Sequence, residues 1–343
     1  MSDVSTTEQD ILSQPTVWQQ TIGLLEAGNL RSVWGTGTTD VIVTGCGSTH
    51  YLAMSAAELL RAVPGLRVRA TPASELMAHA SPRFAAPSST LLLAISRSGA
   101  TSETVAAVEE FRRHGGGRVV AVTTVADCPL VDQADASLVL PTASEVSVAQ
   151  TRSFTSMLLA VQALAAVLGG HDLAVLRQLP QYASDLLERT RESSRALASD
   201  RGIESFYFLG SGALFGVASE AMLKLTEMSL TQSEAYHTLE FRHGPMSMCE
   251  PSVAVLGLIT PERASIERAV IDHVSGLGAR TLTLGPGESV TIPPSLPAWT
   301  RPVLYLLPLQ LLALERALAK GLDPDQPRHL TAVIHLDPLS ESA

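Results

Sequence analysis

Hydroxyl side chains cluster in one short segment, SRSGATSE at residues 96–103, directly after the apolar run LLLAI. The segment combines four hydroxyl residues with Arg97, namely Ser96, Ser98, Thr101 and Ser102. Helix capping explains one or two such hydroxyls, but not four of them beside an arginine at a helix start. Together with the helix dipole, these donors indicate a compact site for a phosphate monoester. No GK[ST] motif follows, so the segment does not resemble a nucleotide-binding P-loop.

A second candidate anion site is the turn GCGST at residues 45–49, between an apolar run and a helical pattern. Such a turn exposes backbone N–H groups at the positive end of a helix, and Ser48 and Thr49 add hydroxyls. A dinucleotide-binding fingerprint would need glycine at position 50, where this chain has His50. The alternative is a tight turn made of small residues.

A carboxylate–lysine–carboxylate pattern is carried by Glu220, Lys224 and Glu227, whose spacing places all three on one helix face. The alternative is a ladder of salt bridges on the surface. Two features favour chemistry. The flanking residues are apolar and small, and Lys224 is one of only two lysines in a chain with 24 Lys and Arg residues, the other being Lys320.

A histidine in a turn completes the set of reactive groups. His243 precedes Gly-Pro in the segment EFRHGP, which disfavours a continuing helix. A lone loop histidine is often a bystander. Its place sixteen residues after Glu227, beside a carboxylate and an arginine, makes it a candidate acid or base.

The elements that must position these groups are short apolar runs alternating with helical patterns, which is typical of βαβ units around parallel sheets. The sequence then restarts: VIVTGCGS at 41–48 and FYFLGSGA at 206–213 share strand, Gly, one residue, Gly and a small residue. We therefore expect two copies of one α/β unit joined by helical segments. The predicted strands are 41–44, 91–95, 119–123, 137–140, 206–209, 253–259, 281–284 and 303–306.

Composition excludes several classes of protein. The 343 residues carry a formal net charge of −10 and are 45% hydrophobic, so the chain lacks the basic surface of a nucleic-acid-binding or anionic-lipid-binding protein. The apolar part of the uncharged run 153–170 is shorter than a membrane span and predicts a buried core helix. Three scattered cysteines and no signal-peptide pattern lead us to expect a cytoplasmic protein with reduced thiols and no membrane partner.

Six segments, in order, resemble the SIS (sugar isomerase) domain family in its tandem form, as in the isomerase half of glutamine–fructose-6-phosphate aminotransferase. The resemblance implies an α/β fold of two SIS domains, each a doubly wound, flavodoxin-like parallel sheet of five strands flanked by helices. We expect a lead-in helix over 1–30, a first domain over 31–170, bridging helices over 171–200 and a second domain over 201–343. The segments are ILSQP (11–15), CGST (46–49), SRSGATSE (96–103), SEVSVAQTRSF (144–154), FLGSG…SEAMLKLTEMS with EAYHTLEFRHGPM (208–246), and PLQLLALERALAKGLDPDQPRHL (308–330).

The resemblance also implies roles for individual residues. Glu227 matches the base that moves a proton between C1 and C2 of the sugar, and Glu220 and Lys224 match supporting positions. His243 matches a histidine that assists ring opening and comes from the neighbouring subunit, which implies a homodimer. Val148 matches a substrate contact. The residues matching those that hold the sugar 6-phosphate are Ser48, Thr49, Ser96, Arg97, Ser98 and Thr101, with Arg97 standing where the family often has glutamine.

One departure separates this chain from the aminotransferase. The family's Schiff-base lysine lies two residues after PRNL, and here PRHL is followed by Thr331 and Ala332. No N-terminal cysteine nucleophile is present, so we do not expect glutamine to be the ammonia source within this chain. The pattern predicts a phosphosugar isomerase/deaminase acting on a glucosamine 6-phosphate-like substrate, with no metal or organic cofactor. The alternatives are a fructosamine 6-phosphate deglycase and a non-catalytic phosphosugar sensor.

Overall fold

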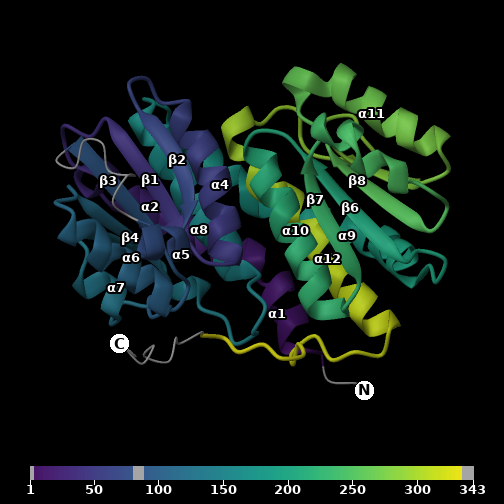
Figure 1. The fold of residues 1–343 in the computed structure, drawn as a ribbon, viewed down its shortest axis with the longest axis horizontal. Helices are drawn as coiled ribbons and strands as arrows, with labels where there is room; N and C mark the ends of the chain where they lie inside the picture. The colour runs from purple at the N-terminus through teal and green to yellow at the C-terminus, as the bar shows by residue number, and fades with distance from the viewer. Residues whose placement is uncertain (1–3, 80–88, 334–343) are drawn as a thin grey trace.

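Two five-stranded sheets, all of whose strand pairs are parallel, form the frame of the molecule (Figure 1). The computed structural model describes residues 4–79 and 89–333. The first sheet has the order β2(Arg67–Pro72)-β1(Asp40–Gly45)-β3(Thr90–Ile95)-β4(Val119–Thr123)-β5(Ala136–Val139). The second has the order β10(Val290–Thr291)-β9(Arg280–Gly285)-β8(Val253–Leu258)-β6(Ser205–Gly210)-β7(Gln232–His237).

Both halves have one topology. Numbered within its own half, each sheet has the flavodoxin-like order 2-1-3-4-5, so the expected fold class is confirmed. The repeated turn is also the same in both halves: Gly47 has φ 53° and Gly212 has φ 55°, each capping the helix that follows the first strand of its half. A positive φ favours glycine, which explains why the sequence repeats glycine at this point.

Each sheet is covered on both faces, which is why its central strands are almost wholly apolar. On the outer face of the first sheet lie α5(Ala73–His79), α6(Ser102–Arg113) and α7(Pro129–Asp132). α11(Ala264–Gly276) covers the outer face of the second. The inner faces of both sheets share one hydrophobic core, so the two halves pack as one body.

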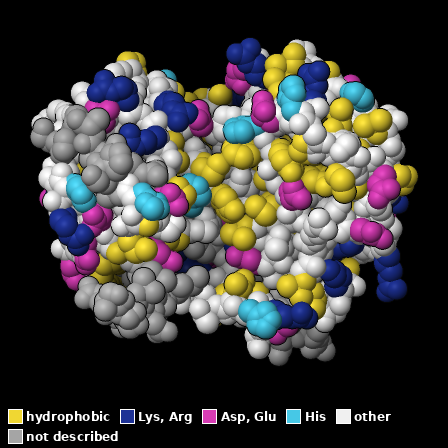
Figure 2. Space-filling model, viewed as in Figure 1, with side chains coloured by type: hydrophobic (Ala, Val, Ile, Leu, Met, Phe, Trp, Pro, Cys, Tyr) yellow, Lys and Arg dark blue, Asp and Glu magenta, His cyan; other side chains and the backbone are white. Residues whose placement is uncertain are grey.

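The shared core is built from helices of both halves. The close contacts are those of α10(Ala213–Ser229) with α4(Ser48–Arg61), and of α12(Pro302–Ala319) with α9(Leu179–Ser199) and α10. The remaining core helices are α2(Gln14–Ala27) and α8(Arg152–Leu168), and the short α1(Thr6–Leu12) and α3(Leu30–Trp34) complete the N-terminal part. On the face drawn in Figure 2, hydrophobic side chains gather where the two halves meet.

Two long apolar helices run through this core. The run predicted as a core helix forms α8, most of whose side chains are buried. Residues Ala298–Ala319 are long and apolar enough by composition to cross a membrane, but 89% of that window is buried inside the protein. Burial on this scale identifies the segment as a core helix of the shared interior.

One predicted strand is wrong and three strands were not predicted. Residues 303–306, predicted as a strand, lie within α12, because a short apolar run in a fully buried helix has no polar face to reveal its period. The missed strands are β2, β7 and β10. They lie at or next to sheet edges; β2 and β7 mix polar with apolar residues, and β10 is two residues long.

Candidate active site

A cavity of about 140 Å³ opens at the carboxyl ends of β1 and β3, where the strand order of the first sheet reverses. Ligands of open α/β sheets bind at such a switch point. Two turns of the first half, a loop before α8, one face of α10 and the C-terminal segment form the walls. The lining residues are Cys46, Gly47, Ser48, Thr49, Arg97, Ser98, Thr101, Val148, Gln150, Lys224, Glu227, Leu330, Thr331 and Ala332.

Ser48 and Thr49 of the first turn both line the cavity, but their hydroxyls have different hydrogen-bond partners. Thr49 Oγ1 accepts from the Cys46 backbone N–H at 2.9 Å and donates to the Cys46 carbonyl at 2.9 Å, which closes the turn. Ser48 Oγ instead accepts a hydrogen bond from Lys224 Nζ at 3.1 Å. The turn therefore connects the predicted anion site to the predicted catalytic helix.

In the second turn, at residues 96–101, some hydroxyl side chains line the cavity and another stabilises the loop. Ser98 and Thr101 line the cavity. Ser96 is buried behind them, where its Oγ accepts from the Gly99 N–H at 3.1 Å and lies 3.2 Å from Thr101 Oγ1. Ser96 thus stabilises the loop by these contacts and is not among the described residues that line the cavity.

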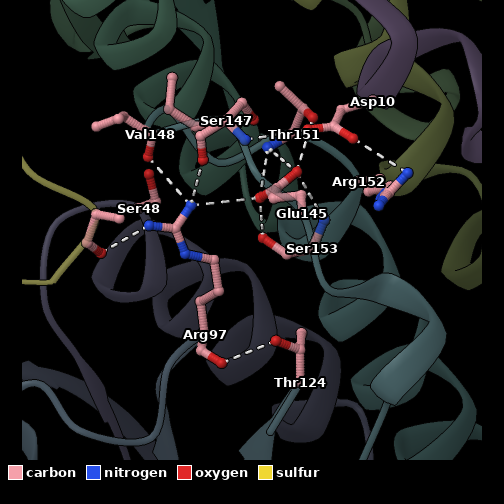
Figure 3. A network of polar contacts seen from close by, with 12 residues as sticks. Asp10, Ser48, Arg97, Thr124, Glu145, Ser147, Val148, Thr151, Arg152 and Ser153 are labelled. Atoms are coloured by element: carbon pink, nitrogen blue, oxygen red, sulfur yellow. Dashed lines mark hydrogen bonds and ion pairs between the residues drawn. The ribbon is translucent and has the colours of Figure 1, made fainter. Parts of the chain in front are cut away.

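Arg97 lines the cavity, but its guanidinium bonds to protein atoms (Figure 3). Nη1 donates to the carbonyls of Ser147 and Val148 at 3.0 and 3.1 Å, and Nη2 donates to that of Ala332 at 2.7 Å. An ion pair with Glu145 at 3.7 Å supplies the opposite charge. Arg97 therefore makes these hydrogen bonds within the protein, from a position in the wall of the predicted phosphate site.

Lys224 and its two carboxylates form a buried cluster beside the phosphate turns. Lys224 Nζ lies 2.5 Å from Glu227 Oε2 and 3.3 Å from Glu220 Oε1. Burial on its own would lower the pKa of Lys224, but the two carboxylates outweigh burial and raise it. Burial, together with the nearby Glu227, raises the pKa of Glu220 to about 8 against the opposing effect of Lys224. Lys224 is therefore a fixed cation, and Glu220 holds a proton more readily than an ordinary carboxyl group.

Glu227 is the carboxylate of this cluster that reaches the cavity. Its side chain is 17% exposed, whereas that of Glu220 is fully buried two turns earlier on α10. The Lys224 ammonium fixes one oxygen of Glu227. A carboxylate held at the edge of a small polar cavity can accept and return a proton on a bound molecule.

His243 lies apart from this cluster. It ends the short helix η5(Glu240–His243) after β7 and is exposed, and it is not among the described residues that line the cavity of its own chain. The cavity thus combines six of the predicted phosphate, substrate and catalytic positions from the first half and two from α10, but not His243.

Three parts of the site were missed by sequence reasoning. Gln150 lines the cavity, and its Oε1 is buried with no hydrogen-bond partner within the described residues. Glu145 opposes Arg97 from inside the protein. The segment Leu330–Ala332 crosses from the second half to form one wall, and Asp325 fixes it by accepting from the Thr7 N–H and hydroxyl at 2.7 Å. Only the family resemblance around PRHL pointed toward this tail.

The described residues contain no group of three or more His, Cys, Asp or Glu side chains able to hold a metal ion. The polar groups of the cavity are hydroxyls, one lysine, one carboxylate, one guanidinium and one amide.

Comparison with known proteins connects this arrangement to one family. The model of the SIS domain matches residues 38–167 and 201–289. The glutamine–fructose-6-phosphate aminotransferase of Gluconobacter oxydans is 30% identical over 320 residues, which are 87% of this chain and 52% of the relative. That of Pyrobaculum aerophilum is 30% identical over 351 residues, 96% of this chain and 57% of the relative. The chain thus spans about half the length of these curated relatives.

Two solved structures share the fold over nearly the whole chain. The glucosamine-6-phosphate deaminase of Thermotoga maritima superposes with a TM-score of 0.86 and 28% identity, covering 97% of this chain and 100% of that one. The tagatose-6-phosphate ketose/aldose isomerase of Escherichia coli has a TM-score of 0.84 and 21% identity, covering 98% and 97%.

Proposed function

We propose that this chain, which belongs to the SIS domain family, is a phosphosugar isomerase/deaminase that acts on an amino-sugar 6-phosphate resembling glucosamine 6-phosphate. The observation that carries the proposal is the meeting of two turns rich in phosphate donors with a lysine-held carboxylate in one small cavity. The similarity to the Thermotoga maritima deaminase supports the same reaction class.

The cavity suggests how the substrate lies. Ser98, Thr101 and the backbone of the 46–49 turn receive the 6-phosphate at the starts of α4 and α6, where helix dipoles favour an anion. C1 and C2 then point toward Glu227. The unpartnered Oε1 of Gln150 accepts a hydrogen bond from a sugar hydroxyl or amino group.

Glu227 carries out the proton transfer in this proposal. With the ring open, its carboxylate removes the proton from C2, which leaves an enolamine, and returns it to C1, which leaves an imine at C2. Water adds to this imine, and the resulting carbinolamine expels ammonia to give the ketose 6-phosphate. Lys224 orients the Glu227 carboxyl group by a hydrogen bond to one of its oxygens.

Ala332 favours release of ammonia over its transfer. Its position matches that of the family's Schiff-base lysine, and it does lie in the cavity wall, where its methyl group cannot form an imine with a ketose. The small, tail-covered cavity also favours loss of ammonia over loss of a bulky amino acid.

His243 enters the proposal from a second copy of the chain. Its exposure on η5, away from the cavity of its own chain, is what a residue donated to a neighbour requires. We therefore propose a homodimer in which each cavity receives His243 of the other copy.

The test is to incubate the purified protein with glucosamine 6-phosphate and to measure ammonia and fructose 6-phosphate. Equal amounts of both products support the proposal. Release of a free amino acid from a fructosamine 6-phosphate, with no ammonia from glucosamine 6-phosphate, would identify a deglycase instead. Tight binding of both compounds without any conversion would identify a sensor.

A further inference from the structure

The hydrogen bonds of Arg97 connect three parts of the chain that are far apart in sequence. Arg97 itself follows β3, Ser147 and Val148 precede α8, and Ala332 belongs to the C-terminal segment (Figure 3). Val148 and Ala332 both line the cavity. All three acceptors are backbone carbonyls, so the contacts depend on where the chain runs and not on which side chains it carries.

Arg97 already has a buried acidic partner inside the protein. The Glu145 carboxylate is fully buried and lies 3.7 Å from the guanidinium. It also accepts hydrogen bonds from the backbone N–H of Thr151 at 3.0 Å and from the Thr151 hydroxyl at 2.8 Å. Burial raises the pKa of Glu145, and the positive charge of Arg97 opposes this effect, so Arg97 favours the ionised form of its partner.

The loop that Arg97 holds is anchored on its other side. Asp10 accepts from the Ser147 backbone N–H at 3.2 Å and pairs with Arg152 at 3.1 Å. The loop is therefore a fixed wall, and the C-terminal segment is the partner that Arg97 holds against it. Within residues 325–332, hydrogen bonds to distant parts of the described chain are made by Asp325 and Ala332, which are the first and last residues of this stretch.

We propose that Arg97 is a positioning residue that holds the C-terminal segment closed over the cavity against the 147–148 loop, and that it is not the main cation for the substrate phosphate. Its effect on the reaction rests on the proposed function, but its effect on the tail does not. The planar guanidinium reaches carbonyls on both sides at once with a fixed fork of donors, a geometry that glutamine and lysine lack.

The first test measures the tail directly and needs no substrate. Arg328 is exposed and lies two residues before the wall segment Leu330–Ala332, so trypsin cleavage after Arg328 reports how often the tail opens. We expect Arg97→Gln to accelerate this cleavage about tenfold or more, because it removes charged hydrogen bonds. An unchanged cleavage rate would overturn the proposal.

A matched control separates the tail from general loss of stability. Arg316 is buried to a similar degree, and it donates to the carbonyls of Ala198, Asp200 and Ile203, away from the cavity. Arg316→Gln should lower the melting temperature without selectively accelerating cleavage after Arg328. If both variants accelerate that cleavage equally, the effect is global and the positioning role is wrong.

Arg97→Lys separates positioning from phosphate binding and also serves if Arg97→Gln does not fold. Lysine keeps the positive charge of arginine but lacks the planar arrangement of several N–H donors. Under the proposal it opens the tail as Arg97→Gln does, and raises KM for glucosamine 6-phosphate about tenfold while changing kcat less. Near-normal tail cleavage and KM in Arg97→Lys, with loss of substrate affinity in Arg97→Gln, would show that Arg97 is a phosphate ligand. If the wild-type protein turns over no phosphosugar, the cleavage result still stands.

Discussion

At the scale of single residues, Lys224 connects the two halves of the molecule chemically. Its ammonium extends from α10 of the second half to the Ser48 hydroxyl of the first, and it is flanked by Glu220 and Glu227. A fully buried lysine is costly unless its charge is matched, and here two carboxylates match it. The cluster therefore holds the candidate base in position and fixes α10 against the phosphate turn.

The two lysines of the chain provide a matched pair of substitutions. Lys224→Met leaves two carboxylates at a buried site without their cation, and we expect it to lower the free energy of unfolding by about 3–5 kcal/mol. Lys320→Met removes an exposed lysine whose hydrogen bonds within the described residues are to Leu230 and Thr231, and it should change stability by less than about 1 kcal/mol. Urea denaturation of both variants checks this. Equal losses would mean that the cluster does not stabilise the fold.

Glu220 gives stability a dependence on pH. Burial raises its pKa to about 8 in the folded protein from the usual glutamate value of 4.5, so between these values the folded state binds more protons than the unfolded state. Stability must then fall as the pH rises through this window. The melting temperature of the wild type should fall from pH 5 to pH 8 relative to that of Glu220→Gln. Lys224 does not contribute to this effect, because its raised pKa places its titration above this window. If the melting temperatures of the two proteins changed with pH in parallel, the assignment to Glu220 would be refuted.

At the scale of elements, sequence reasoning succeeded where burial is uniform. The strands at the centre of each sheet are apolar throughout and were predicted close to their observed bounds. β7, with the sequence QSEAYH, has no such signal because it is a half-exposed edge strand. Gln150 and Glu145 could not be assigned roles from sequence, since their importance arises from contacts with Arg97 and the cavity that only the folded chain creates.

The packing of α4 against α10 is what joins Ser48 to Lys224. A Cβ atom on Gly216 of α10 would lie 2.4 Å from the Tyr51 carbonyl and 2.3 Å from Ser55 Oγ on α4, so only glycine permits this approach. We expect Gly216→Ala to cost about 1–3 kcal/mol of stability through overpacking, and to reduce activity by displacing Lys224.

Gly23 provides the control for this substitution. It lies in the exposed part of α2 with open space around its Cα, so Gly23→Ala should be neutral or stabilising by up to about 1 kcal/mol. Thermal unfolding of both variants compares them directly. A Gly216→Ala protein as stable and active as Gly23→Ala would show that the helix contact does not set the site.

At the scale of the whole molecule, the chain contains two similar units, and within the described residues the hydroxyl-bearing turns of this site come from the first. The turn at Gly212 repeats the backbone of the turn at Gly47, but Ala213 and Leu214 stand where the first half has Ser48 and Thr49. The second half instead contributes α10 and the tail. The hydrophobic side chains gathered where the halves meet (Figure 2) and the exposed His243 are consistent with the proposed pairing of two copies.

Mixing two inactive variants tests this pairing. Glu227→Gln and His243→Ala each lose activity under the proposal. Co-expressed in equal amounts they should restore about a quarter of wild-type activity, because half of the dimers then carry one intact site. The control is each variant expressed alone, which forms dimers without an intact site. No recovery despite confirmed mixed dimers would mean that His243 does not act across the interface.

The most direct test of the central claim, that Glu227 moves the sugar proton at the cavity of the first half, compares Glu227→Gln with the wild type on glucosamine 6-phosphate. Ammonia release gives the rate, and the thermal shift with the same compound gives binding. Glu188→Gln, which alters an exposed carboxylate on α9, outside the described cavity lining and away from η5, is the matched control. We predict that Glu227→Gln lowers kcat by roughly 10²-fold or more with the thermal shift retained, and that Glu188→Gln changes neither. A Glu227→Gln protein that still releases ammonia at a near-normal rate would contradict the assignment.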